Sequence, residues 1–515
     1  MRVLLVYPPH TRNTEPPLGL GLLTADLNSL GIEARIVDLN ALAAPYLALS
    51  APVRSISGRR RSRAVRRVEE SVRALRSGEL YESVSRYRTA LEYYAEALRA
   101  VCEGTGVILT PGDFKAPAYC GFEENVVREV AASRLGGFWD LAFEKFLAEE
   151  LDSFDPKVVG VSITYRSQFL PAVCLCSYLK ERRPEINLIL GGAFLSSLPQ
   201  ETAAAWGSLF GPVVRGPGES PLRKLLGIPS RALPSFRDPD FTGVRFDAYF
   251  APYRVAPISS SRGCYWRRCA FCAEAAVPFS MDDPKAFMGR LERLAKRYEI
   301  SLFHFTDNAI PPAVLKELAR CGSPAPWYGF VRAERILADQ AFVEDLAASG
   351  CSMLQLGFET PVRKLLEKLR KGVEPELFLP ITRTLRDCGI AVYVYLLFGL
   401  PGQGRPECEQ SMALVEEAQP DFLNASVFRL PPQAEAAREP ERFGIGEVGE
   451  RASRDLYLQF RAPGMDLPDL RRWLSRRFYR SPAVRKAQAA TPRYFKSSHA
   501  VFFTPKSAPR SAHRR

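Results

Sequence analysis

Residues 261–272 carry the sequence SRGCYWRRCAFC, which places Cys264, Cys269 and Cys272 within nine positions. Four residues separate the first two cysteines, and two residues separate the last two. On both sides of this stretch the chain shows long runs in which strand patterns alternate with helix patterns. The cysteine spacing and these two runs together predict the fold and the chemistry.

Three interpretations of the cysteines compete. A structural zinc site takes four ligands, usually as two pairs, and the chain contains no second Cys-x2-Cys pair. A nucleophilic thiol needs only one cysteine. An iron–sulfur cluster with three thiolate ligands leaves one iron open for a small molecule, so it accounts for the missing fourth cysteine. The other eight cysteines are scattered, and Cys174 and Cys176 fit the core of a predicted helix.

Length and composition describe a globular chain of two to four domains, with 515 residues of which 46% are hydrophobic. No apolar run approaches the roughly 20 residues of a membrane span, and Pro8 and Pro9 interrupt the first apolar run, so no signal peptide is expected. A cytoplasmic location is therefore expected, where cysteines stay thiols or bind metals.

The net charge of +13 is concentrated at one end of the chain. Residues 471–515 hold 13 Lys or Arg and no Asp or Glu, so the rest of the chain is balanced. A second basic run, at 59–76, fits the exposed face of a helix. Either run could contact phosphates, but solvated surfaces account for both, so no nucleic-acid partner is expected.

The first alternating run predicts a doubly wound α/β sheet, because buried parallel strands are continuous apolar stretches separated by helices. Its strand patterns lie at 2–7, 34–40, 156–164, 186–194 and 211–220, and its helix patterns lie at 19–30 and 172–184. Residues between about 45 and 150 exceed one crossover, and helix patterns at 61–100 and 123–151 predict a helical insertion.

The second run predicts a (β/α) barrel, full or partial. Its strand patterns lie at 302–308, 327–335, 353–360 and 391–402, and its helix patterns lie at 284–298, 311–321, 337–349, 361–370 and 375–388. Asp307, Asn308, Arg332 and Glu359 follow its strands, and such ends carry the chemistry of barrels. Each alone fits a helix cap or a surface ion pair, but four together indicate a site beside the cysteines.

Nine motifs occur in a fixed order along the chain: PPLGL (16–20), VVGVSITYRSQ (158–168), LILGGAF (188–194), VVRGPGES (213–220), SRGCYWRRCAFC (261–272), FTDN (305–308), VRAER (331–335), LGFET (356–360) and FGLPG (398–402). With them the chain resembles the radical SAM enzymes that contain a cobalamin (B12)-binding domain, over roughly 1–40 and 155–430. Two details depart from that family: the first cysteine gap has four residues instead of three, and Gln403 replaces the usual Glu after FGLPG.

The resemblance implies a [4Fe–4S] cluster on Cys264, Cys269 and Cys272, with S-adenosyl-L-methionine on the open iron. It implies binding of S-adenosylmethionine by Phe271, Asp307, Asn308, Arg332, Glu359 and Gly399. Phe271 would flank the adenine, Asp307 and Asn308 would face the methionyl group, and the Arg and Glu would lie near the carboxylate and ribose. A flavodoxin- or ferredoxin-type reductant is the implied electron donor.

The resemblance also implies cobalamin in the first domain. The residues expected to contact it lie at strand and helix ends: Pro17, Gly19, Ser162, Thr164, Gly191, Gly192, Gly216 and Glu219. Many cobalamin domains supply a histidine beneath cobalt from an Asp-x-His-x-x-Gly motif, and none of the four histidines lies in one. His10 follows the first strand without that Asp or Gly, so no histidine ligand is expected.

The domains are expected at 1–235 for the Rossmann-like cobalamin domain, 236–430 for the radical SAM barrel, 431–503 for a helical C-terminal region and 504–515 for a disordered basic tail. The implied activity is methyl transfer to an unactivated carbon of a small-molecule or peptide natural-product precursor. The alternatives are a radical SAM cyclase or oxidative rearrangement enzyme without net methylation, an RNA-modifying enzyme and a zinc-stabilised structural protein. Iron and sulfide content separates the last from the others.

Overall fold

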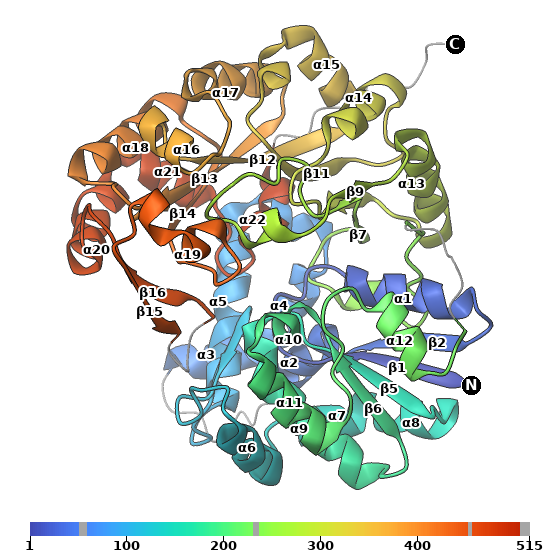
Figure 1. Ribbon diagram of the computed structural model, residues 1–515. Coiled ribbons are helices and arrows are strands. Elements are labelled where there is room, and N and C mark those ends of the chain that lie inside the picture. Colours follow the sequence, from blue (N-terminus) through green and yellow to red (C-terminus); the bar gives the residue numbers. More distant parts are fainter. Residues whose placement is uncertain (51–58, 230–235, 452–455, 505–515) are drawn as a thin grey trace. The chain divides into compact units, whose positions relative to one another are not determined.

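The computed structural model describes residues 1–50, 59–229, 236–451 and 456–504. The chain divides into two compact units, Met1–Val255 and Ala256–Arg515 (Figure 1). The boundary expected after residue 235 adjoins residues 230–235, which fall outside the described residues. So do residues 505–515 of the tail expected at 504–515. No helix in the described ranges is long and apolar enough to cross a membrane.

Unit 1 contains a four-stranded parallel sheet in the order β2-β1-β5-β6. The strands are β1 (Arg2–Tyr7), β2 (Glu33–Asp38), β5 (Val158–Ser162) and β6 (Asn187–Gly191). The predicted doubly wound sheet is confirmed. The strand expected at 211–220 is wrong, because only Val213 forms a bridge there, to Leu190. The following Gly216 has a φ of 77°, which ends extended backbone.

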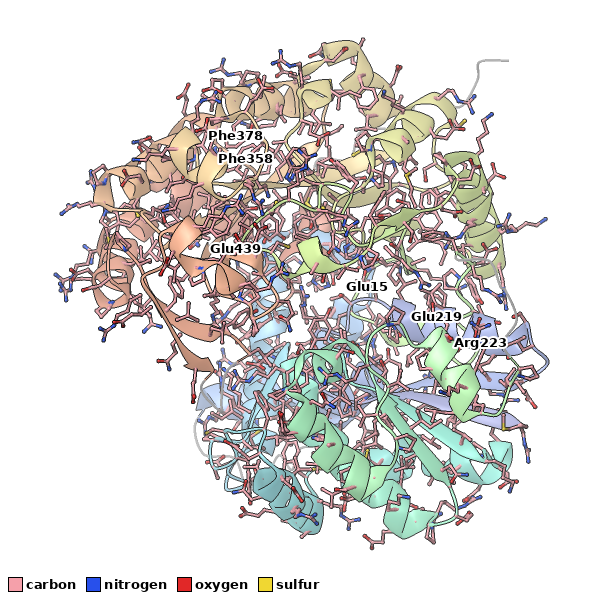
Figure 2. The ribbon with its side chains drawn as sticks, in the orientation of Figure 1. Glu15, Glu219, Arg223, Phe358, Phe378 and Glu439 are labelled. Carbon is pink, nitrogen blue, oxygen red and sulfur yellow. The ribbon has the colours of Figure 1, made fainter. Side chains whose placement is uncertain are left out.

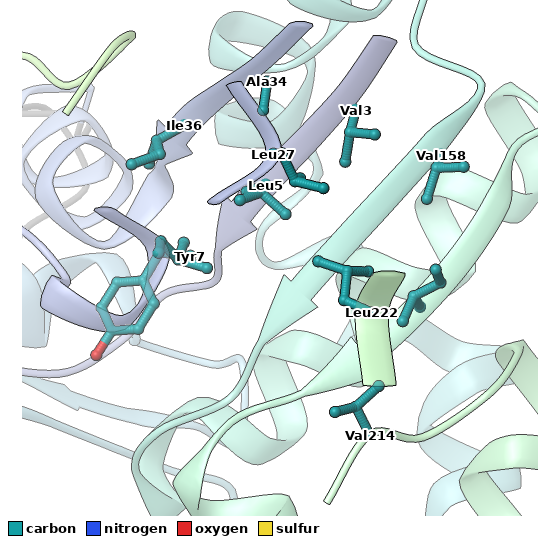
Figure 3. Packing of buried hydrophobic residues seen from close by; sticks show 11 residues of the cluster. Val3, Leu5, Tyr7, Leu27, Ala34, Ile36, Val158, Val214 and Leu222 are labelled. Atoms are coloured by element: carbon teal, nitrogen blue, oxygen red, sulfur yellow. The ribbon is translucent and has the colours of Figure 1, made fainter. Parts of the chain in front are cut away.

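One face of this sheet packs against α1 (Leu18–Asn28) and α12 (Glu219–Leu225). Alternate side chains of the strands point to this face, among them Val3 and Leu5, and they bury against Leu27 and Leu222 (Figure 3). The other face is buried as well, because β1 has no exposed residue between Val3 and Tyr7. This accounts for the continuous apolar strand pattern.

The helical insertion is confirmed between β2 and β5. Its helices are α2 (Leu39–Leu49), α3 (Arg59–Arg66), α4 (Val68–Leu75), α5 (Val84–Val101), α6 (Glu124–Gly137), α7 (Asp140–Phe146) and α8 (Ala148–Phe154). A short hairpin of β3 (Ile108–Thr110) and β4 (Asp113–Lys115) interrupts them. Strands of three residues are too short for periodicity to predict. The crossover to β6 is α9 (Phe169–Arg182).

Unit 2 contains a six-stranded sheet in the order β14-β13-β12-β11-β10-β7. The strands are β7 (Val255–Ile258), β10 (Leu302–Phe305), β11 (Trp327–Val331), β12 (Cys351–Glu359), β13 (Ala391–Phe398) and β14 (Phe422–Val427). Strands β10 to β14 pair in parallel. Among the described residues no pairing joins β14 to β7, so the barrel is partial.

Helices follow the strands as the second run predicts: α13 (Pro284–Tyr298), α14 (Pro312–Cys321), α15 (Gln340–Ala348), α16 (Arg363–Lys368), α17 (Phe378–Asp387) and α18 (Arg405–Ala418). Beyond β14 lie α19 (Glu435–Arg438), α20 (Leu467–Arg476), α21 (Pro482–Ala490) and α22 (Lys496–Ala500). The C-terminal region expected to be helical over 431–503 is only partly so. An antiparallel pair, β15 (Glu447–Arg451) and β16 (Leu458–Arg461), occupies part of it, where Gly444, Gly446 and Gly449 disfavour a helix.

Candidate functional site

The three clustered cysteines lie in one loop of unit 2, residues 263–279, named here the cysteine loop. The antiparallel pair β8 (Ser261–Arg262) and β9 (Ser280–Met281) closes its base. The Cys272 N–H donates to the Cys269 carbonyl at 3.2 Å, which makes a tight turn between these two cysteines. All three are free thiols; Cys269 is buried and the other two are half-buried.

This donor set fits an iron–sulfur cluster better than a single ion. Within the described ranges, no three His, Cys, Asp or Glu side chains form a group that could hold one metal ion. A [4Fe–4S] cluster instead places its thiolate ligands on separate irons, so the sulfurs need not converge on one point. Burial raises the pKa of Cys269, and the nearby positive charges of Lys371 and Arg332 oppose that rise.

The cysteine loop is fixed to unit 2 through aromatic residues between its cysteines. The Trp266 indole N–H donates to the Arg370 carbonyl at 2.8 Å. The Tyr265 hydroxyl donates to the Glu334 carboxylate at 2.8 Å. Residues 265–268 fill the longer first gap of the cysteine pattern, so the extra residue lies in a segment that docks on the protein.

Arg332, just after β11, holds the same loop. Its guanidinium lies 4.3 Å from the centre of the Trp266 ring. The guanidinium donates to Glu334 at 3.1 Å and to the carbonyls of Lys371 and Gly372 at 2.5 and 3.1 Å. These hydrogen bonds use its Nε and Nη2, and the Trp266 contact places the guanidinium against the cysteine loop.

Glu359, at the end of β12, forms a buried ion pair with Lys371 at 2.6 Å. The Lys371 ammonium also lies 5.7 Å from the centre of the Phe271 ring, beside Cys272. Sequence reasoning missed Lys371, which follows α16 outside every motif. A lysine one to three residues beyond a helix is common, so no sequence signal distinguished it.

Asp307 and Asn308, after β10, also contact the cysteine loop or its base. Asp307 is buried and accepts hydrogen bonds from the Ser260 N–H and hydroxyl and from the Ser261 hydroxyl, at 3.1, 2.8 and 2.5 Å. Burial raises its pKa and these bonds oppose the rise. Asn308 donates to Glu274 of the cysteine loop at 2.9 Å. The four predicted strand-end residues therefore gather around one loop.

Gln403 explains the second departure from the family pattern. Its side-chain oxygen accepts the N–H groups of Gly399 and Leu400 at 2.7 and 3.2 Å. The turn after β13 therefore needs an acceptor at this position, and a glutamine amide supplies one as well as a carboxylate does. Gln403 is buried, so the neutral side chain also avoids the desolvation of a charge.

In unit 1 the strand order reverses between β1 and β5, where doubly wound sheets bind ligands. Gln168 bridges the two strand ends. Its amide donates to the Pro8 carbonyl at 2.7 Å and accepts the N–H groups of Thr164 and Tyr165, both at 3.0 Å. In the adjoining loop the buried Asn13 amide has no hydrogen-bond partner among the described residues. An orphaned amide at this edge fits a ligand that carries hydrogen-bonding groups.

The glycines predicted at this edge differ in their surroundings. A Cβ on Gly192 would lie 2.3 Å from the Ile163 carbonyl, so close backbone packing already requires glycine there. A Cβ on Gly191 would lie 3.6 Å from the Val214 carbonyl oxygen, an ordinary contact. Gly19 and Gly216 have open space around them. Glu219 begins α12 beside Gly216, and Pro17 precedes α1 (Figure 2 labels Glu219).

His10 lies inside unit 1 against the insertion. Its Nε2 bonds to the Thr110 carbonyl at 2.7 Å, and its ring stacks on Trp139 with centroids 6.4 Å apart. Burial lowers its pKa to about 4, so the ring is neutral at pH 7. The structure gives His10 a role in holding the β3–β4 hairpin.

Comparisons with known proteins agree with this architecture. Residues 258–415 match the radical SAM superfamily model. The chain is 22% identical to an uncharacterised methyltransferase, PH0819, of Pyrococcus horikoshii, across 56% of this chain and 70% of that protein.

Two solved structures share the fold. One is the radical S-adenosylmethionine methyltransferase TsrM from Kitasatospora setae, with cobalamin and a [4Fe–4S] cluster bound: TM-score 0.51, 18% identity, 85% of this chain and 77% of that one. The other is the cobalamin-dependent S-adenosylmethionine radical enzyme OxsB with aqua-cobalamin bound. The two chains superpose with a TM-score of 0.56 and 10% identity, over 90% of this chain and 64% of OxsB. At these identities the likeness establishes the two-domain α/β fold.

Proposed function

We propose that this chain, a radical SAM superfamily member by its domain at residues 258–415, is a cobalamin-dependent methyltransferase acting on an unactivated carbon of a small molecule or peptide. The observation that carries the proposal is the cysteine loop, which holds three thiols and whose Phe271 ring lies 5.7 Å from the ammonium of Lys371, the partner of Glu359. The likeness to a methyltransferase of Pyrococcus horikoshii supports methyl transfer, and an equal likeness to the magnesium-protoporphyrin IX monomethyl ester cyclase of Cereibacter sphaeroides makes a cyclase the second candidate.

When bound, a [4Fe–4S] cluster with S-adenosylmethionine would supply one-electron chemistry, and cobalamin would supply the methyl group. Cys264, Cys269 and Cys272 would hold the cluster. Lys371 and Glu359 would hold a buried pair of opposite charges near it.

The remaining residues hold this arrangement still. Arg332 and Trp266 fix the first half of the cysteine loop, and Asp307 fixes its base through Ser260 and Ser261. We propose that Phe271 flanks the adenine, and that the open edge of unit 1 near Asn13, Thr164 and Gly216 contacts cobalamin.

The test is anaerobic reconstitution of the full chain with iron, sulfide and cobalamin, followed by product analysis. We expect about four irons per chain, retained cobalamin, and both S-adenosylhomocysteine and 5′-deoxyadenosine when an accepted substrate is supplied. Formation of 5′-deoxyadenosine without S-adenosylhomocysteine from such a substrate would contradict methyl transfer and favour a cyclase or rearrangement. Zinc in place of iron would contradict the whole proposal.

A further inference from the structure

The sheet of unit 2 has two chemically different faces. On one face Phe305 packs against Phe287 of α13, with ring centroids 5.5 Å apart. On the same face Phe358 stacks on Phe378 of α17, with centroids 4.0 Å apart (Figure 2). Helices therefore cover this face, and apart from Ser352 its strand residues in β12 and β13 are apolar.

The opposite face, named here the cysteine-side face, carries the alternate strand residues. They include His304, Tyr328, Phe330, Gln355, Gly357, Tyr393, Tyr395, Leu397 and Asn424, and the same registers add Met353, Ala391, Phe422 and Ser426. Leu397 packs in one apolar cluster with Ala270 and Phe271 of the cysteine loop. A Cβ on Gly357 would lie 3.0 Å from the Lys371 Nζ. The cysteine-side face therefore continues directly from the candidate cluster site.

Aromatic rings dominate this face. His304 and Tyr328 are stacked with centroids 4.4 Å apart, and Phe330 and Tyr395 lie 4.8 Å apart. Phe330 and Tyr395 keep part of their surface exposed, although strands on both sides flank them. None of the strand residues named on this face is charged. Away from Gly357, where the Glu359–Lys371 pair covers the strand, a ligand on this surface would meet ring faces and edges.

Gln355 is the exception on this aromatic surface. It lies in register with Phe330 on one side and Tyr393 on the other, and it is fully buried. Neither its Nε2 nor its Oε1 has a hydrogen-bond partner among the described residues. A buried amide without partners makes the fold less stable, and a bound molecule that pairs with the amide would remove that cost.

We propose that Gln355 and the rings beside it form the substrate subsite, and that the substrate is a neutral planar ring with adjoining N–H and C=O groups. This rests on the proposed function, because the subsite would serve that reaction. The Gln355 amide offers one acceptor and a donor side by side, which such a lactam-like edge complements. Gln355 precedes Gly357 by two strand residues, roughly 7 Å, so one ring compound would reach from the amide to the vicinity of Lys371.

The experiment compares Gln355→Leu with the wild-type full chain, both reconstituted anaerobically. The probes are 2-quinolinone, which carries the N–H and C=O pair, and naphthalene, which has similar rings without it; binding is measured by isothermal titration calorimetry. The wild type should bind 2-quinolinone about tenfold or more tightly than naphthalene, since two hydrogen bonds distinguish them. Gln355→Leu should lose this preference.

Gln403→Leu is the matched control for stability. Gln403 is equally buried in the same unit, but its oxygen accepts two N–H groups. Gln403→Leu should lower the melting temperature, whereas Gln355→Leu should leave it unchanged or raise it. A fall with Gln355→Leu, or equal binding of the two probes by the wild type, would overturn the inference and indicate a buried water or a structural role.

The two proposals fail separately. Probe binding needs no turnover, and iron content and cleavage of S-adenosylmethionine are measured on the same samples. A normal cluster without selective probe binding overturns the subsite alone. Selective probe binding without a cluster overturns the proposed function, because the aromatic face would then serve another reaction.

Discussion

The two parallel sheets of this chain hold their strand ends in different ways. In unit 2 the ends are held by buried charges, namely the Glu359–Lys371 pair and Arg332 beside Glu334. In unit 1 the ends of β1 and β5 are joined by the neutral amide of Gln168, and Asp38 of β2 bonds to the Tyr249 hydroxyl at 2.6 Å. Paired charges therefore hold the strand ends beside the cysteines, whereas a neutral amide joins β1 and β5, and the one carboxylate at the end of β2 is held by a phenol hydroxyl.

The largest effect should come from the cysteines of unit 2. Cys269→Ala should abolish cluster assembly and reductive cleavage of S-adenosylmethionine, because one iron loses its thiolate. Iron analysis and the yield of 5′-deoxyadenosine measure this. Cys264→Ala and Cys272→Ala should behave alike. Cys388→Ala, at the end of α17 and away from the cysteine loop, is the control and should keep both. Full cleavage activity in Cys269→Ala would refute the assignment.

In unit 1 the largest effect should come from Gly192. Gly192→Val places a side chain against the Ile163 backbone at a φ of 107°, so local unfolding free energy should fall by more than about 3 kcal/mol. Cobalamin should be lost while the cluster remains. Gly216→Ala has open space and should cost only about 1–2 kcal/mol. Hydrogen exchange of β1 and β5 peptides measures the local unfolding free energy of the two variants. Equal losses in Gly192→Val and Gly216→Ala would contradict the packing argument.

Breaking the charge pair of unit 2 should have the next effect. Lys371→Met leaves Glu359 buried and unpaired, at a cost of about 3–5 kcal/mol. The double variant Lys371→Met/Glu359→Gln should recover at least half of that loss in urea unfolding. The exposed pair of Arg472 and Asp469 is the control, and Arg472→Met should leave the urea midpoint almost unchanged. Additive effects of the two changes at the buried pair would show that the residues do not interact.

The smallest effect is a pH dependence in unit 1. Burial raises the pKa of Asp38 to about 6, so this group makes the fold less stable as pH rises from about 4 to 6. Burial lowers the pKa of His10 to about 4, so this group makes the fold less stable as pH falls from about 6.5 to 4. The two contributions oppose each other, and each changes the free energy of unfolding by at most about 3 kcal/mol.

Variants separate these slopes. Asp38→Asn should leave a fold that loses stability on acidification, and His10→Gln should leave one that gains it. Hydrogen exchange of β1 and β2 peptides between pH 4 and 7 measures both. Parallel profiles for the two variants would contradict the buried, oppositely shifted groups. His10→Gln should also leave the visible spectrum of bound cobalamin unchanged.

Strand and helix order was predictable over most of both units, because buried parallel strands and amphipathic helices each have their own spacing of apolar residues. The cysteine loop was predictable because its spacing is local. β7 and β14 were missed, since short apolar stretches at a sheet edge have no distinctive period. The pair β15–β16 was expected to be helical, and only partners distant in sequence reveal it as a hairpin.

The sequence by itself determined the two alternating sheets, the helical insertion and the three thiols, because each depends on neighbours within a few residues. Only the tertiary structure decided that Lys371 pairs with Glu359, that Arg332 holds Trp266, and that Gln355 lies buried without a partner. Each of these three environments is built from strands and loops that lie far apart in the sequence. Burial and charge pairing depend on which elements meet in space, and residue spacing along the chain does not encode that meeting.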